Sequence, residues 1–61
     1  KTMNEYDTEN LGKILRGHGD WFNAQLLRLI CKADDSNFRK LNEQFPAQCK
    51  AVAEYRGWPK L

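Results

Sequence analysis

Residues 21–33 carry the pattern that most constrains how this chain can fold. Drawn as a helix at about 100° per residue, the segment has an apolar arc of roughly 220°, interrupted only by Asn23. The arc consists of Phe22, Ala24, Leu26, Leu27, Leu29, Ile30, Cys31 and Ala33. A helix that packs on a core from one side needs an apolar stripe of only ~100° or slightly more. We therefore expect a central helix that is contacted from two or more sides.

The remaining segments also have helical rather than strand periodicity. No stretch alternates strictly between apolar and polar residues, and β-branched residues are few. With 61 residues the chain is also too short for a second domain. We expect a single all-α domain over residues 1–61, a compact bundle of four short helices in which three surround the central one.

Capping residues set the expected limits of the first helix. Asp7 can accept backbone N–H groups and start this helix, and Gly17 supplies the left-handed residue that ends it. Thr2 and Glu5 also have capping-box spacing, which offers an earlier start. Residues 1–6 are thus either irregular or the beginning of the first helix.

The later helices have clear start and stop signals. Asp20 is expected to cap the central helix. Three good capping residues at 34–36 predict a third helix that continues to about Phe45. Pro46 suits the first turn of a fourth helix, and Gly57 ends it.

A polar line along the central helix is the sharpest candidate site. Trp21, Gln25, Arg28 and Lys32 recur at i, i+4, i+7 and i+11, which places them together opposite the apolar arc, with Arg39 as a neighbouring candidate. Tryptophan and arginine dominate the energetics of protein interfaces, so the line predicts a partner-binding surface. The plainer alternative is that Trp21 folds back onto the first helix and the others are merely solvated.

This hypothesis makes two opposite predictions for mutations in the central helix. Arg28→Glu is expected to leave the fold intact and to abolish capture of a partner. Leu29→Ala is expected to remove a core contact and to destabilise the fold by about 2–5 kcal/mol.

The residues suited to catalysis or metal binding are few. His18 could act as a general base oriented by Asp20, but the flanking glycines and Asp20 already have roles in ending and starting helices. Cys31 and Cys49 lack Cys-x-x-Cys spacing, and His18 is the only histidine. We expect no enzymatic activity, no metal site and no cofactor, and we expect both cysteines to be reduced.

Nucleic-acid binding is the alternative function. The short connection at residues 34–35 is compatible with a helix-turn-helix, with Ser36, Asn37, Arg39 and Lys40 where base-reading side chains would lie, although any small helical protein contains a pair of helices with a short turn. The net charge is only +2, however, and two carboxylates stand at the turn.

The end of the chain is expected to be irregular over residues 58–61. Trp58, with Tyr55 nearby, either folds back to close the core or forms an exposed anchor for a dimer or another partner. Self-association into a homo-oligomer therefore also stays open. The chain has neither a leader pattern nor an apolar run long enough to span a membrane, so we expect a cytoplasmic protein.

Several segments resemble a group of short, uncharacterised helical proteins encoded by bacteriophages and prophages. The similarity covers roughly residues 11–58 and lies in Gly17-His18-Gly19-Asp20-Trp21-Phe22, Leu26-Leu27-Arg28-Leu29-Ile30, Lys32-Ala33-Asp34 and Phe45-Pro46. Phe38 and the two cysteines depart from the group's pattern. The resemblance implies a phage or mobile-element origin, a location in the host cytoplasm and, by analogy, binding to a host protein such as an enzyme or a defence complex.

Overall fold

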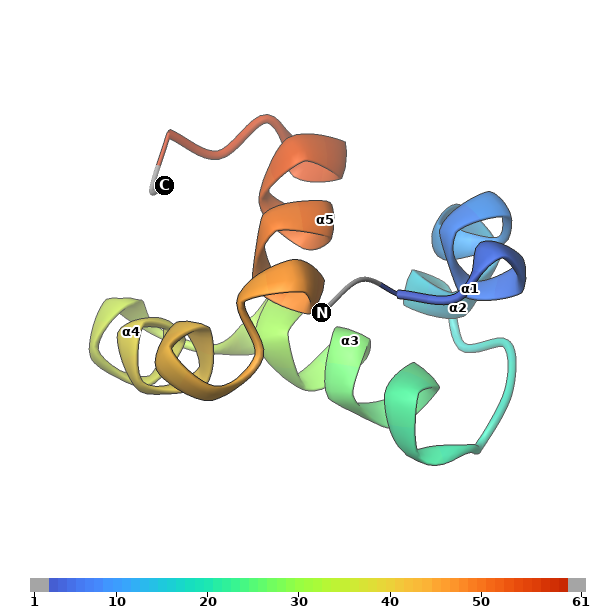
Figure 1. Ribbon diagram of the computed structural model, residues 1–61, viewed down its shortest axis with the longest axis horizontal. Coiled ribbons are helices and arrows are strands. Elements are labelled where there is room, and N and C mark those ends of the chain that lie inside the picture. The colour runs from blue at the N-terminus through green and yellow to red at the C-terminus, as the bar shows by residue number, and fades with distance from the viewer. Residues whose placement is uncertain (1–2, 60–61) are drawn as a thin grey trace.

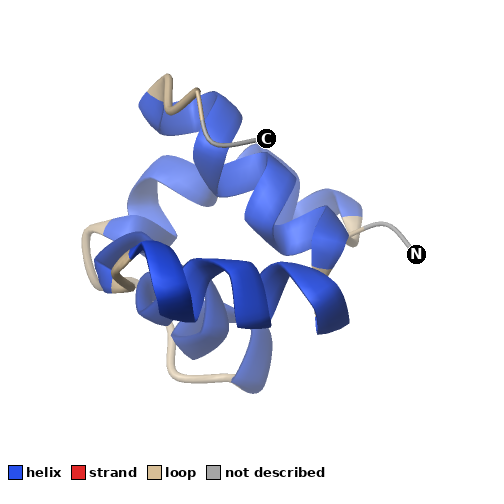
Figure 2. Ribbon diagram, turned by 90° about the vertical axis from the view of Figure 1, so that its left-hand side faces the viewer, coloured by secondary structure: helices blue, strands red, loops and turns tan. Residues whose placement is uncertain are grey.

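The computed structural model describes residues 3–59, which form five α-helices joined by short connections. They are α1 (Glu5–Glu9), α2 (Leu11–Leu15), α3 (Phe22–Lys32), α4 (Asp35–Gln44) and α5 (Pro46–Arg56). α1 and α2 lie at one end of the molecule and α4 at the other, with α3 running between them beneath α5 (Figure 1). The described residues contain helices and loops but no strand (Figure 2). The predicted all-α class is confirmed.

The N-terminal part differs from the prediction in its capping. Asn4 is the N-cap of α1, because its Oδ1 accepts the backbone N–H of Asp7 at 2.8 Å. Asp7 therefore lies inside α1 and does not start it. Glu5 and Tyr6, which were expected to be either irregular or an earlier beginning, belong to the helix. Residues 1–2, and with them the proposed capping role of Thr2, lie outside the described residues, as do residues 60–61.

The predicted first helix is in fact two helices separated at Asn10. The Asn10 side chain donates from Nδ2 to the carbonyl of Tyr6 at 2.9 Å, and its own backbone has φ −107° and ψ 19°. Asparagine side chains compete with the backbone for such carbonyls, which disfavours a continuous helix. This break explains why the described residues contain five helices rather than the predicted four.

Two glycines end helices as predicted. Gly17 has φ 116°, and the backbone N–H of His18 reaches the carbonyl of Lys13 at 3.0 Å. Gly57 has φ 72°, and the N–H of Trp58 reaches the carbonyl of Ala53 at 2.8 Å. Both turns are Schellman motifs, in which a left-handed glycine lets the next N–H satisfy a free carbonyl of the last turn.

The starts of the three longer helices confirm two predictions and correct one. Asp34 caps α4, with its Oδ1 accepting the N–H of Asn37 at 2.8 Å. Pro46 occupies the first turn of α5. Asp20, however, does not cap α3, because the chain enters this helix one residue later, at Trp21, without a side-chain cap.

The core lies where α3 and α5 meet, with α2 and α4 at its sides. It contains Leu11, Ile14, Ala24, Leu26, Leu27, Ile30, Phe38, Cys49, Val52 and Ala53. Leu26, Leu27 and Ile30 are buried, so α3 is a central helix. It is not fully surrounded, because α4 packs mainly against α5. Two residues predicted for the core, Phe22 and Leu29, are therefore 70% and 47% exposed.

A short polar network that includes the buried Asp7 explains Asn23 within the apolar arc. Asn23 donates from Nδ2 to Oδ2 of Asp7 at 2.6 Å, and its Oδ1 accepts from Nε2 of Gln48 at 3.1 Å. Asp7 is only 1% exposed. A buried polar group without a hydrogen-bond partner would destabilise the fold. Here the Asp7 carboxylate accepts a hydrogen bond from Asn23, and the Asn23 carbonyl accepts one from Gln48. The network joins α1, α3 and α5.

Candidate functional site

Arg28 holds the loop that precedes α3. Its Nη1 donates to the carbonyls of Ile14 at 2.8 Å and His18 at 3.1 Å, and its Nη2 donates to the carbonyl of Gly19 at 2.6 Å. The planar guanidinium can meet several carbonyls at once, which a lysine ammonium does less well. Arg28 is half-buried, so it does not lie free on the solvent side as the sequence suggested.

Trp21 packs in an aromatic cluster with Tyr6 and His18. The indole makes edge-on contacts with Tyr6 at 6.0 Å and with His18 at 5.8 Å between ring centroids, and the Tyr6 hydroxyl lies 3.2 Å from Nε2 of His18. Trp21 is 37% exposed. The alternative that Trp21 folds back onto the first helical segment is thus the arrangement found, since Tyr6 belongs to α1.

Gly19 is required by this packing. Its φ is 89°, and a Cβ at this position would overlap the Trp21 ring. Gln25 supports the same loop, because its Nε2 donates to the backbone carbonyl of Asp20 at 2.7 Å. His18 interacts with Tyr6 and Trp21 rather than with Asp20, so the geometry does not form the His18–Asp20 pair that a general base would need.

The outer face of α3 holds the largest exposed apolar residues of this helix. Phe22 contacts Phe45 at 6.2 Å between ring centroids, and most of its ring stays accessible. Leu29 follows seven residues later, two helical turns along the same face. Sequence reasoning assigned both residues to the core. The width of the apolar arc was the signal that part of it would stay exposed, since a bundle of short helices cannot cover so much of one helix.

These residues line two adjoining hollows, which we call the α3 groove. The first has a volume of about 390 Å³ and is lined by Phe22, Gln25, Leu26, Arg28, Leu29 and Lys32. The second has a volume of about 490 Å³ and is lined by Leu29, Lys32, Ala33, Asp34, Asn37, Lys40 and Leu41. Because both include Leu29 and Lys32, they form one strip from the start of α3 to the side of α4.

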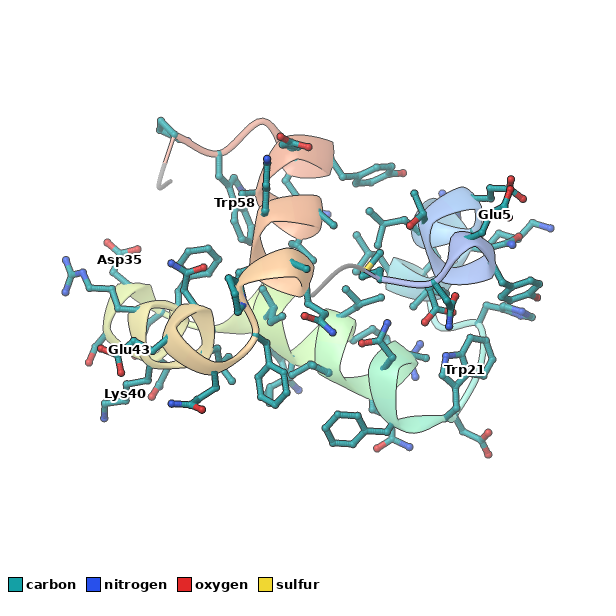
Figure 3. All side chains as sticks on the ribbon, viewed as in Figure 1. Glu5, Trp21, Asp35, Lys40, Glu43 and Trp58 are labelled. Atoms are coloured by element: carbon teal, nitrogen blue, oxygen red, sulfur yellow. The ribbon has the colours of Figure 1, made fainter. Side chains whose placement is uncertain are left out.

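The structure therefore divides the predicted partner-binding residues. Gln25, Arg28 and Lys32 line the α3 groove, whereas Trp21 does not. Trp21 lies at the start of α3, away from Lys40 on α4 (Figure 3). Arg39 is exposed on α4 but lines a separate hollow with Asp35, Phe38 and Pro59.

The residues of the proposed helix-turn-helix are exposed at the start of α4. Ser36, Asn37, Arg39 and Lys40 all lie on the surface. Asp34 accepts the N–H of Asn37, so a carboxylate occupies the end of the helix where phosphate would be attracted.

Trp58 completes the core. Its indole makes an edge-on contact with Phe38, with 6.0 Å between ring centroids, and it is half-buried. This placement confirms the interpretation that Trp58 folds back onto the core. Tyr55, in contrast, is 51% exposed on α5.

The cysteines and the acidic residues do not form a metal centre in the part of the chain that the structure describes. No group of three or more His, Cys, Asp or Glu side chains is placed there to hold an ion. Cys31 and Cys49 are both free thiols. Burial raises the pKa of the Cys49 thiol, so this group stays protonated at neutral pH.

No protein-family model, curated protein or solved structure matches the chain. None of the helices within residues 3–59 is long and apolar enough to cross a bilayer.

Proposed function

We propose that this chain is a small protein-binding module without catalytic activity of its own, and that the α3 groove is its binding surface. Phe22 and Leu29 are the anchors, and Gln25 and Lys32 form the polar rim. Arg28 shapes the groove and holds the loop behind it. The resemblance to short phage proteins supports a protein of the bacterial host, in its cytoplasm, as the partner.

The exposure of Phe22 and Leu29 is the observation that carries this proposal. Single exposed apolar side chains are common on soluble proteins, and two that share one helix face and line the same hollow support an interaction site here. Burying apolar area contributes about 25 cal/mol per Å², so covering these two side chains would stabilise a complex. An aromatic anchor surrounded by polar groups is typical of the centre of an interface.

Affinity capture with groove variants tests the proposal. The wild-type protein, Phe22→Ser and Leu29→Ser are immobilised and exposed to lysate of a bacterial host, and captured proteins are identified by mass spectrometry. Tyr55→Ser is the matched control, because it removes an exposed aromatic side chain from α5 instead. We expect the two groove variants to lose a protein that the wild type and the control retain. Equal capture by all four would refute the proposed function.

A further inference from the structure

We infer that the α3 groove takes an amphipathic α-helix whose polar flanks are acidic. This inference rests on the proposed function and specifies the chemistry of the partner. It follows from the charges that line the groove, from the spacing of its anchors and from the lack of strands in residues 3–59.

The lining of the α3 groove is basic. Arg28, Lys32 and Lys40 line it, against a single carboxylate, Asp34. Asp34 is already used to cap α4. The carbonyls that receive the Arg28 hydrogen bonds carry no formal charge, so its positive charge is not neutralised by an acid there. A partner with carboxylates beside its apolar residues would match this field.

The same charges disfavour a second copy of this chain as the occupant. A symmetric dimer through the groove would place the mainly basic lining of one copy, including Lys32 and Lys40, against the same mainly basic lining of the other. Like charges placed opposite each other in an interface destabilise it. The groove therefore favours an acidic partner over a second copy of this chain.

The anchors have the spacing that a helix presents. Phe22 and Leu29 are seven residues apart, or about 10 Å along α3. A partner helix laid along the groove would offer apolar side chains at i, i+3 or i+4, and i+7 over the same length. A peptide that binds by strand addition would need a sheet edge, and the described residues form no sheet, whereas a helix satisfies its own backbone hydrogen bonds.

A pair of designed peptides tests the inference. Both contain about 18 residues, long enough to form a helix, with leucines at i, i+3, i+4 and i+7 in an alanine background. One carries glutamates on its flanks and the other carries lysines at the same positions. Binding is followed by NMR titration of the ¹⁵N- and ¹³C-labelled protein and by calorimetry. We expect the glutamate peptide to shift the signals of Phe22 and Leu29 and to bind about tenfold or more tightly than the lysine peptide.

Charge reversal on the protein supplies the second measurement. Lys32→Glu combined with Lys40→Glu should reverse the preference between the two peptides, while circular dichroism shows an unchanged fold, since both lysines are exposed. Lys50→Glu on α5 is the matched control and should leave the preference unchanged.

Three results would overturn the inference: equal binding of both peptides, no binding of the glutamate peptide, or displacement of that peptide by anionic phosphatidylserine vesicles. The last result would assign the surface to a membrane. If one of these results is obtained but Phe22→Ser and Leu29→Ser lose a host protein that the wild type captures, only the helical and acidic character of the partner is refuted. If capture is unaffected by Phe22→Ser and Leu29→Ser, the proposed function fails as well.

Discussion

The two exposed sides of α3 have opposite relations to the rest of the molecule. On the side towards the loop, polar residues whose types suit a partner also have internal contacts: Arg28 and Gln25, at the edge of the α3 groove, hold loop carbonyls, and Trp21 packs on Tyr6 and His18. On the outer side, Phe22 and Leu29 appear suited to a core but remain exposed. Residue type alone thus does not show which side of a helix is available for binding; the length and position of its neighbours decide this.

The first prediction separates the buried and outer faces of α3 by substituting two leucines. Leu27 is fully buried, and Leu27→Ala should lower the free energy of unfolding by about 2–5 kcal/mol. Because a chain of this length has a total stability of about 3–9 kcal/mol, much of the population would unfold. Leu29→Ala should instead change stability by about 0.5 kcal/mol or less, since Leu29 is 47% exposed.

Urea unfolding followed by circular dichroism measures both substitutions. This expectation replaces the core role that the sequence suggested for Leu29. A loss of 2 kcal/mol or so in Leu29→Ala would contradict the outer face described here.

The second prediction concerns the loop side and is smaller. Arg28→Glu removes three donors to backbone carbonyls and places a carboxylate against them. Hydrogen bonds from a charged group contribute about 1.5–3 kcal/mol, so we expect the free energy of unfolding to fall by roughly that amount. The expectation from sequence that this substitution leaves the fold intact is therefore revised.

Arg28→Lys provides the control for charge. It keeps the positive charge but lacks the fork of donors, so it should recover only part of the lost stability. Full recovery would show that charge, rather than the hydrogen bonds to the loop, accounts for the effect.

The third and smallest prediction examines the aromatic cluster. Gly19→Ala forces a left-handed conformation on a residue with a Cβ and displaces the Trp21 ring. We expect a loss of about 1–2 kcal/mol and a red shift of tryptophan fluorescence as the indole becomes more exposed. Gly17→Ala has a similar φ but open space around its Cβ, so it should lose stability without the spectral change.

Local chemistry made several helix limits predictable. Gly17 and Gly57 adopt a positive φ, which other residues adopt poorly. Asp34 and Pro46 act within one helical turn of their own position. The N-terminal region was harder, because Asn4, Asp7, Thr8 and Asn10 all have capping ability within a few residues. Sequence cannot choose among them without knowing that Asp7 is buried against Asn23.

The candidate site was less predictable than the fold. The sequence predicts that the site lies on α3, because the apolar arc of this helix identifies it as central. Which residues of α3 stay exposed depends on where α4 packs. Because α4 packs mainly on α5, it covers little of α3. This tertiary choice left Phe22 and Leu29 exposed and placed Arg39 on a different hollow.

The fork of Arg28 also acts as a rotational lock. Its three acceptors lie on one side of α3, so the helix cannot turn about its own axis without breaking them. Phe22 and Leu29 point about 100–120° away from Arg28 around the helix. Together with the buried side chains of the helix, these hydrogen bonds keep Phe22 and Leu29 facing outward. A substitution at residue 28 would therefore be able to change the orientation of the binding surface without changing any residue in the Phe22–Leu29 pair.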